Sequence, residues 1–370
     1  MFKKGGIYMH GGDIYTEGIL KGKELIDFSS NINPLGLPDS FKDNLQEALN
    51  WVQIYPDIQY RNLKRNLIDY LSFFLDYFYK EKVGKLNIKE ENLVLGNGAV
   101  EIIDLAISNL KSISILVPSF VEYELCAKKW NVQIDYCNLN EDMTYNYENI
   151  KKSLEKTEGI ILGNPNNPNG SVIDKDKFIY ILDYCEKNNK IVILDEAFIE
   201  FTGKNSFSFL NLCERYKCIF IIRALTKFFS MPGIRFGYGI SFNNEFLNKI
   251  REKQNPWNIN CFAEIAVKYV LKDEEFIEKS INYIEKEKIF IYENLKKCDL
   301  FQDVYSTYSN FILCKLKDIT GEQLKQRLLD KGFVLRICKD FKTLNNDYVR
   351  FAIKTRELNQ ALVNILKEIK

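Results

Sequence analysis

The stretch KIVILDEAFIEF, residues 190–201, decides the fold that the sequence predicts. Four large aliphatic residues in a row, followed by an acidic pair, indicate a short strand that is buried on both faces and ends at Asp195. Similar runs lie on both sides of it along the chain, namely NLVLG, SISILV, VQIDYC, GIILG, CIFII and FGYGISF. The segments between them have the length and pattern of amphipathic helices. This alternation predicts an α/β domain with a mostly parallel sheet of seven strands, flanked by helices.

The pattern changes near residue 256. From there to residue 370, long charged helices alternate with short strands such as SNFILCKL and YVRFAIK, which indicates a smaller α+β domain. We therefore expect a large domain over residues 38–255 and a small domain over residues 256–370. An N-terminal arm, residues 1–37, is expected to contribute to the small domain and to the active site.

Composition and charge disfavour several classes of protein. The chain has 51 Lys plus Arg against 50 Asp plus Glu, so its net charge of +1 gives no general attraction to nucleic acid or to an anionic membrane. No apolar run is long enough to span a bilayer or to form a signal peptide. The nine cysteines show no C-x-x-C spacing, which is typical of reduced thiols in a cytoplasmic protein. With one histidine, His10, we expect no His-based metal site and no Ser-His-Asp triad.

Ligands of open α/β sheets bind beyond the carboxyl ends of the strands, so the residues after each run are the candidates for a site. The run NLVL is followed by GNGAVE, in which Gly98, Ala99 and Val100 open a helix and can bind a phosphate through backbone N–H groups. A dinucleotide motif would have a third glycine where Glu101 stands, so that interpretation is rejected. Taken alone, the glycines could also serve only to cap the helix.

Two further runs end in side chains that suit a flat polar ligand. Phe120 follows SISILV and could stack on a ring, although a core position would explain it equally well. The turn NPNNPNG, residues 164–170, is rigid enough to hold the amide of Asn167 in one orientation. Asp195 ends a buried strand, where an unpaired carboxylate is costly and needs a cationic partner.

The segment RALTKFFSMPGIRFGYG, residues 223–239, places cations in an otherwise apolar sequence. Together with the other strand ends, it suits a flat heteroaromatic cation that carries a phosphate and an aldehyde, which is pyridoxal 5′-phosphate. Lys227 is then the Schiff-base lysine, and Asp195 keeps the ring nitrogen protonated. Thr226 and Arg235 are expected to hold the phosphate.

In order and spacing, GNGAVE, PSFVEY, NPNNPNG, DEAFIEF, LTKFFSMPGIRFGY and YVRFAIKT resemble the fold-type-I aminotransferase family, in its histidinol-phosphate aminotransferase-like branch. The resemblance covers essentially the whole chain. It implies that Lys227 binds the cofactor covalently, that Asp195 pairs with the ring nitrogen, that Asn167 donates to the ring oxygen O3′ and that Phe120 stacks on the ring. The segment YPD resembles the one whose tyrosine, here Tyr55, reaches the cofactor phosphate of the neighbouring subunit, which implies a homodimer with shared sites.

One position departs from the family. Where the family often has a tyrosine three residues after the aspartate, this chain has Phe198, so the cofactor loses a hydrogen-bond donor and the mechanism cannot be copied from the transaminases. MHGGDIY, with His10 and Gly11, and DFSSNINPLGLP, with Asn31, are similar to the branch that decarboxylates L-threonine O-3-phosphate. That resemblance implies formation of (R)-1-aminopropan-2-ol O-phosphate for cobalamin biosynthesis.

Two arginines in the C-terminal part complete the expected site. Arg336 and Arg350 are expected to bind the phosphate of the substrate, because a dianion suits two guanidinium groups better than a carboxylate does. His10 and the backbone of Gly11 would join them, while Asn31 and Asn167 would steer the substrate carboxylate without neutralising it.

Two other functions stay open as alternatives. The first is a histidinol-phosphate or related aminotransferase, since it would use the same residues and a phosphate-bearing amine. The second is a non-catalytic ligand-sensing relative attached to a DNA-binding domain. The second is disfavoured because the sequence has no basic stripe and no room for a winged helix before residue 30.

Overall fold

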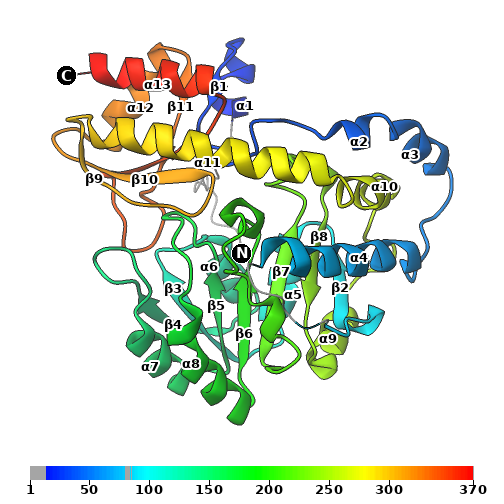
Figure 1. The fold of residues 1–370 in the computed structure, drawn as a ribbon. Helices are drawn as coiled ribbons and strands as arrows, with labels where there is room; N and C mark the ends of the chain where they lie inside the picture. Colours follow the sequence, from blue (N-terminus) through cyan, green and yellow to red (C-terminus); the bar gives the residue numbers. More distant parts are fainter. Residues whose placement is uncertain (1–13, 80–83, 85, 370) are drawn as a thin grey trace.

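The computed structural model describes residues 14–79, 84 and 86–369, and a seven-stranded sheet forms its centre (Figure 1). The strand order is β2-β8-β7-β6-β5-β3-β4. Strands β7, β6, β5, β3 and β4 run parallel to one another, whereas β8 is antiparallel to both of its neighbours. The strands are β2 (Leu93–Gly96), β3 (Ser112–Val117), β4 (Gln133–Asn138), β5 (Gly159–Gly163), β6 (Ile191–Asp195), β7 (Ile219–Ala224) and β8 (Gly237–Ile240). The predicted mostly parallel seven-stranded α/β sheet is therefore confirmed.

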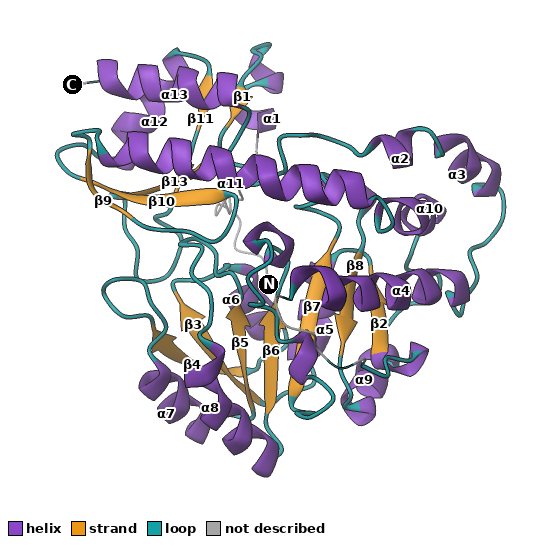
Figure 2. Cartoon of the chain, viewed as in Figure 1, coloured by secondary structure: helices purple, strands orange, loops and turns teal. Residues whose placement is uncertain are grey.

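Helices cover both faces of this sheet (Figure 2). The alternation of side chains along β5 and β6 explains why: Ile160 and Val192 face the core shared with α4 and α8, while Ile161 and Ile193 face the core shared with α5, α6 and α9. All four are fully buried. These helices are α4 (Arg61–Phe78), α5 (Ala99–Ile107), α6 (Glu122–Lys129), α7 (Tyr147–Lys156), α8 (Lys175–Lys187) and α9 (Asn244–Arg251).

A second sheet lies above the carboxyl ends of the first (Figure 1). It has four antiparallel strands in the order β12-β13-β10-β9 and is accompanied by α11, α12 and α13. Its elements are β9 (Phe301–Val304), β10 (Phe311–Leu316), β12 (Arg336–Ile337), β13 (Tyr348–Ala352), α11 (Glu274–Lys296), α12 (Gly321–Asp330) and α13 (Arg356–Glu368).

The N-terminal part of the chain joins this upper unit. Strand β1 (Ile26–Asp27) pairs in parallel with β11 (Phe333–Val334), so residues more than 300 positions apart are neighbours. The remaining helices are α1 (Ile14–Glu17), α2 (Asp39–Lys42), α3 (Leu45–Trp51) and α10 (Cys261–Val270), with 3₁₀ turns at Ile19–Lys21, Glu90–Asn92, Ile199–Thr202, Leu210–Leu212 and Pro232–Ile234. The domain boundaries near residues 37 and 255 stay a prediction.

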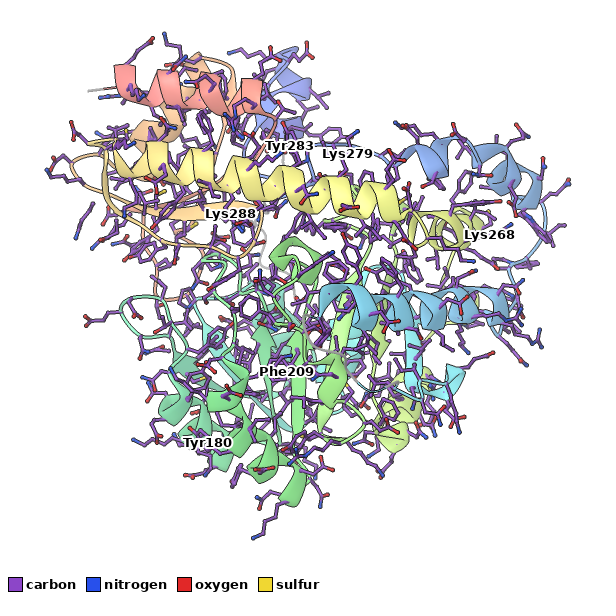
Figure 3. All side chains as sticks on the ribbon, viewed as in Figure 1. Tyr180, Phe209, Lys268, Lys279, Tyr283 and Lys288 are labelled. Atoms are coloured by element: carbon purple, nitrogen blue, oxygen red, sulfur yellow. The ribbon has the colours of Figure 1, made fainter. Side chains whose placement is uncertain are left out.

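The distribution of side chains is that of a packed core with a charged shell (Figure 3). Phe209 is fully buried between the helices and the sheet, whereas Tyr180 on α8 is 41% exposed. Lys268, Lys279 and Lys288 lie on α10 and α11, outside the core (Figure 3). Among the residues that the structure describes, no helix combines the length and apolarity needed to cross a bilayer.

Candidate active site

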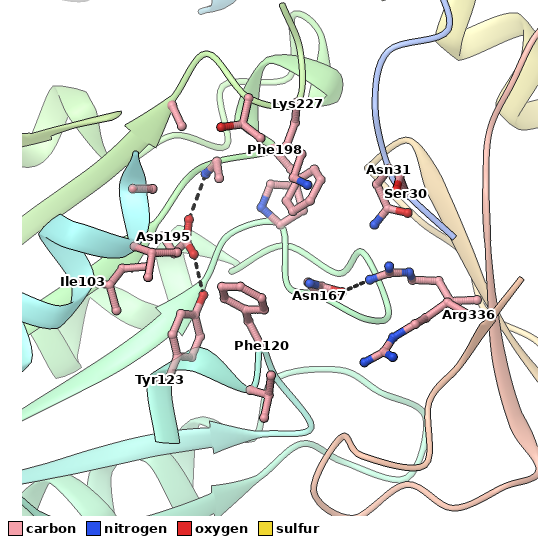
Figure 4. A pocket seen from close by; sticks show the side chains of 18 of the residues that line it. Ser30, Asn31, Ile103, Phe120, Tyr123, Asn167, Asp195, Phe198, Lys227 and Arg336 are labelled. Carbon is pink, nitrogen blue, oxygen red and sulfur yellow. Dashed lines mark hydrogen bonds between the residues drawn. The ribbon is translucent and has the colours of Figure 1, made fainter. Parts of the chain in front are cut away.

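One pocket collects most of the predicted site residues above the carboxyl ends of β5, β6 and β7 (Figure 4). It lies between the large sheet and the strands β12 and β13 of the upper sheet. The predicted residues that line it are Asn31, Ala99, Val100, Phe120, Asn167, Asp195, Thr226, Lys227, Arg235, Arg336 and Arg350. The structure thus brings together residues from five strand ends and from the N-terminal segment, as expected for a ligand site of this architecture.

Asp195, the last residue of β6, supplies a buried carboxylate to the pocket. Its Oδ2 accepts a hydrogen bond from the Tyr123 hydroxyl at 2.7 Å, and its Oδ1 accepts one from the backbone N–H of Ala197 at 3.1 Å. Burial raises the pKa of Asp195 above its ordinary value, although both hydrogen bonds act in the opposite direction. No cationic side chain among the described residues forms an ion pair with it, so the site has room for a cationic ligand.

Tyr123 is a site residue that the sequence did not reveal. It lies in the first turn of α6, and its ring stands perpendicular to that of Phe120, with centroids 5.7 Å apart. The tyrosine holds Asp195 from one side, while Phe120 offers a ring face to the pocket (Figure 4). The motif PSFVEY contains both aromatics, but nothing in its spacing shows that the second one reaches a strand end 72 positions away.

Lys227 follows β7 and points its amine into the pocket (Figure 4). The pKa of Lys227 is lowered to about 8, mainly by burial and also by the charges of Arg350 and Arg235, while Asp195 opposes them. Its Nζ is 5.8 Å from the ring centre of Phe198. An amine with this pKa is partly unprotonated near neutral pH, which is the state that attacks an aldehyde.

Arg235 and the start of α5 form a cradle for an anion. Gly98 has φ = 85°, and a side chain at this position would collide with the guanidinium of Arg235. Arg235 donates only to backbone carbonyls, those of Pro232 at 3.3 Å and Asn97 at 3.4 Å. Its charge therefore has no carboxylate partner among the described hydrogen bonds. An arginine next to a helix N-terminus is a suitable phosphate site.

Arg336 and Arg350 lie directly opposite each other on the antiparallel strands β12 and β13. Both are buried, with 5% and 4% of their surface exposed. Arg336 donates to Asp340 at 2.5 Å, whereas Arg350 donates to Asn167 Oδ1 and to the backbone carbonyl of Ser29. Two like charges at this position repel each other, so an anion between them is stabilising.

Two buried polar atoms of this pocket lack a hydrogen-bond partner among the residues that the structure describes. They are Nε of Arg350 and Oδ1 of Asn31. Burial lowers the pKa of Arg350 to about 10, and the neighbouring Arg336 acts in the same direction. Buried polar groups in proteins are nearly always satisfied, so these two atoms indicate a polar ligand.

Two of the predicted residues that the structure describes, Gly98 and Tyr55, are not part of the pocket lining. Tyr55 is outside the pocket and 78% exposed, with its ring centre 5.0 Å from that of Trp257. Its expected role is in a neighbouring subunit and stays a prediction. His10 and Gly11 lie outside the described residues.

Comparison with known proteins places this geometry in a family. The model of the class I and II aminotransferases matches residues 23–366. The chain belongs to this family. The predicted fold-type-I architecture and its aminotransferase-like ancestry are therefore confirmed.

Three relatives show how similar this chain is to proteins of the family. A protein of Caldanaerobacter subterraneus subsp. tengcongensis, provisionally named a threonine-phosphate decarboxylase, is 38% identical over 97% of this chain and 93% of its own. The threonine-phosphate decarboxylase of Salmonella typhimurium is 29% identical over 97% of this chain and 96% of its own. The crystal structure of the histidinol-phosphate aminotransferase from Clostridium acetobutylicum is 46% identical, covers 93% of this chain and 99% of its own, and superimposes with a TM-score of 0.87.

Proposed function

We propose that this protein is a pyridoxal-phosphate-dependent decarboxylase of L-threonine O-3-phosphate. The reaction takes up one proton and releases carbon dioxide and (R)-1-aminopropan-2-ol O-phosphate, the linker of the cobalamin nucleotide loop. The family and the two relatives named as threonine-phosphate decarboxylases support this assignment. The observation that carries it is the distribution of the cationic side chains that line the pocket.

The residues present fit the cofactor. Lys227 would bind it covalently, Asp195 would pair with its ring nitrogen, and Phe120 would lie against its ring. Arg235 and Thr226, with the backbone of residues 98–100, would hold its phosphate in the cradle that a side chain at position 98 would fill. When bound, pyridoxal phosphate supplies a sink for the electrons that a bond to the α-carbon releases.

The substrate phosphate would bind between Arg336 and Arg350. The orphaned Nε of Arg350 can donate to a phosphate oxygen, and a dianion would relieve the repulsion between the two facing guanidinium groups. Asn167 already accepts a hydrogen bond from Arg350, so the amide that would contact the cofactor is linked to the group that would bind the substrate.

The α-carboxylate of the substrate would then have no cation of its own. The described side chains that line the pocket include four cations, namely Lys227, Arg235, Arg336 and Arg350. Lys227 and Arg235 are assigned to the cofactor, and the two others to the substrate phosphate. A carboxylate that is not held by a charge is not stabilised in the ground state, which favours its loss. Lys227, with a pKa of about 8, can hold the proton that returns to the α-carbon.

The same proposal includes a homodimer with shared sites. Tyr55 lies in a patch of large apolar side chains that are 44% to 78% exposed. Such a concentration is typical of a surface that a protein partner covers. We expect a second copy to cover it and to bring its Tyr55 to the cofactor phosphate. The patch consists of Leu49, Trp51, Val52, Ile54, Tyr55, Ile58 and Trp257.

Product analysis tests the proposal. The purified protein is incubated with pyridoxal phosphate and L-threonine O-3-phosphate, and both carbon dioxide and the phosphorylated amine are quantified. We expect the two products in equal amounts, with no requirement for a keto acid. The Arg336→Met variant is the matched control, because it keeps Lys227 and Asp195 but loses a proposed phosphate ligand together with its ion pair to Asp340.

A second candidate function is a histidinol-phosphate aminotransferase. It is favoured by the 46% identity to the Clostridium acetobutylicum protein of that name. It predicts that histidinol phosphate and 2-oxoglutarate give glutamate, and that phosphothreonine gives no carbon dioxide. That pair of results would reject the decarboxylase assignment.

A further inference from the structure

Asn33 connects three parts of the molecule: the N-terminal segment to which it belongs, the turn that carries Lys227, and the helix α11. It is 2% exposed and belongs to the N-terminal segment SSNIN, residues 29–33. Its neighbours in space are the turn that carries Lys227 and the helix α11. Neither the pocket lining nor the sequence motifs assign it a role.

The contacts of Asn33 with the Lys227 turn are numerous and short. Its backbone N–H donates to the carbonyl of Lys227 at 3.1 Å, and its Nδ2 donates to the carbonyl of Phe228 at 2.8 Å. In return, Ser230 Oγ donates to the carbonyl of Asn33 at 2.6 Å. Three of the four residues of the turn are therefore bound by one residue from a distant part of the chain.

Two further hydrogen bonds hold the side-chain amide of Asn33 in place. Nδ2 also donates to Ser280 Oγ of α11 at 2.8 Å, and Oδ1 accepts from the backbone N–H of Leu35 at 3.1 Å. Ser280 is fully buried. A buried amide whose donors and acceptor are all used cannot change orientation without losing hydrogen bonds.

The same segment is bound to the side of the pocket that faces the small sheet. The carbonyl of Ser29 accepts from Arg350 at 3.0 Å, and the carbonyl of Ser30 accepts from Lys354 at 3.0 Å. Between these two carbonyls and Asn33 lies Asn31, whose side chain borders the pocket (Figure 4). Five consecutive residues thus connect the arginine proposed for the substrate with the turn of the lysine proposed for the cofactor.

We propose that Asn33 is a positioning residue for Lys227: its buried side chain holds the turn 227–230 and thereby sets the place of the lysine amine relative to Arg350. The inference rests on the proposed role of Lys227 in binding the cofactor. It goes beyond that function by naming a residue that touches neither cofactor nor substrate. A lysine that forms a covalent bond has to be held in one geometry, and its own side chain has too many rotamers to do this alone.

Four charged groups of the described residues influence the pKa of the Lys227 amine. Arg350 and Arg235 lower its pKa, whereas Asp195 and Asp27 raise it, and burial is the largest cause of its low value. A turn that is released from Asn33 would let water reach the amine and increase its distance from Arg350. Both changes move the pKa of Lys227 upward, toward the ordinary value of a lysine.

The test is a titration of Lys227 in the full-length protein without aldehyde. The protein is labelled briefly with an amine-reactive reagent over a series of pH values, and the peptide that contains Lys227 is quantified by mass spectrometry. Asn33→Ala is compared with Ser280→Ala, which removes a hydrogen bond of the same amide but leaves the bond to Phe228. Because the lysine itself is titrated, the result does not depend on whether the proposed reaction is correct.

We expect Asn33→Ala to raise the pKa of Lys227 from about 8 and Ser280→Ala to leave it unchanged, even where the two variants lose equal thermal stability. If Asn33→Ala does not fold, Asn33→Leu replaces it, since it removes the side-chain donor to Phe228 with little change in volume. A titration curve of Lys227 that coincides with that of the unmodified protein in the folded Asn33 variant would overturn the proposal. An equal shift in Ser280→Ala would do the same, because it would assign the effect to the contact with α11.

Discussion

Arg223 and Arg350 are two buried arginines with opposite surroundings. Arg223, in β7, is 1% exposed and donates to Glu196 from both Nε and Nη2, at 3.1 and 2.9 Å. Its guanidinium also lies 3.8 Å above the ring centre of Phe74. Arg350, in β13, is 4% exposed and, within the described part of the chain, donates only to an amide oxygen and a carbonyl. A carboxylate therefore neutralises the charge of Arg223, whereas none of the described carboxylates binds Arg350.

The pKa values follow this difference. Burial opposes the charge of Arg223 more strongly than any single neighbour favours it. Glu196 and the other acidic and phenolic groups around it together outweigh burial, so the pKa of Arg223 is raised above its ordinary value. Burial lowers the pKa of Arg350 to about 10, and no hydrogen-bonded carboxylate compensates for it. A buried charge that the chain itself neutralises contributes to the fold, whereas one that it leaves without a counterion is a candidate ligand for an anion.

Lys227 belongs to the second kind, and its removal gives the largest expected effect. Lys227→Ala should lower turnover by about 10⁴-fold or more, because the covalent attachment of the cofactor and a proton donor are lost together. Steady-state decarboxylation with phosphothreonine measures the loss. Retention of the covalent chromophore in this variant would contradict the assignment.

The stability of the same variant gives a control that depends on pH. The folded pKa of Lys227 is about 8, below its ordinary 10.5, so below pH 8 the buried amine is charged and destabilises the fold. Between pH 8 and 10.5 the folded state has lost this proton while the unfolded state keeps it, so the stability of the unmodified protein relative to the variant rises with pH. The difference should change by up to about 3 kcal/mol over this window, measured by urea unfolding.

The second-largest effect is the difference in stability between variants of Arg223 and Arg350. Arg223→Met should lower the free energy of unfolding by about 3–5 kcal/mol, because Glu196 is left buried without its partner. Arg350→Met should change it by less than about 2 kcal/mol, since it loses two hydrogen bonds but also removes an uncompensated buried charge. Urea unfolding at neutral pH measures both. Equal losses in the two variants would show that Arg350 contributes to the stability of the fold as much as Arg223 does.

The third effect is the loss of activity in the Arg350 variant. Arg350→Met should lower kcat/KM for phosphothreonine by about 100-fold, as expected when one partner of a buried ionic contact is removed. An unphosphorylated substrate, threonine, should be affected much less, which serves as the control. A similar loss on both substrates would show that Arg350 supports the pocket and does not bind the phosphate.

The smallest effect concerns the hydroxyl of Tyr123. Tyr123→Phe removes the 2.7 Å hydrogen bond to Asp195, which lowers the pKa of that carboxyl, so the pKa of Asp195 should rise further. We expect about 10-fold weaker binding of pyridoxal phosphate, because the charged form that pairs with the ring nitrogen becomes less favourable. Equilibrium titration with the cofactor at several pH values measures this change, which should be largest at low pH.

The sequence predicted the fold and most of the pocket because both produce local signals. Strand β6 is a continuous aliphatic run, and Asp195 stands at its end where the polarity changes. The glycines before α5 and the lysine after β7 are similarly marked by their neighbours. Once parallel strands are recognised, their carboxyl ends must lie together, so these residues are brought into one site without further information.

The residues that the sequence did not reveal act over long distances along the chain. Tyr123 reaches Asp195 over 72 positions, and Asn33 reaches Phe228 over 195 positions. Glu196 follows Asp195 directly, but it faces away from the pocket and pairs with Arg223. Which of two adjacent acids faces the ligand depends on the side of the chain that each one occupies, and the order of residues along the chain does not determine it.

The parallel pairing of β1 with β11 has a consequence for synthesis on the ribosome. The partner of Ile26, Phe333, is synthesised about 300 residues after it. At 5–20 residues per second, this interval is roughly 15–60 s. Ser29, which follows β1, likewise binds Arg350, 321 positions later in the chain, so the nascent chain cannot assemble a complete pocket before β12 and β13 have been synthesised.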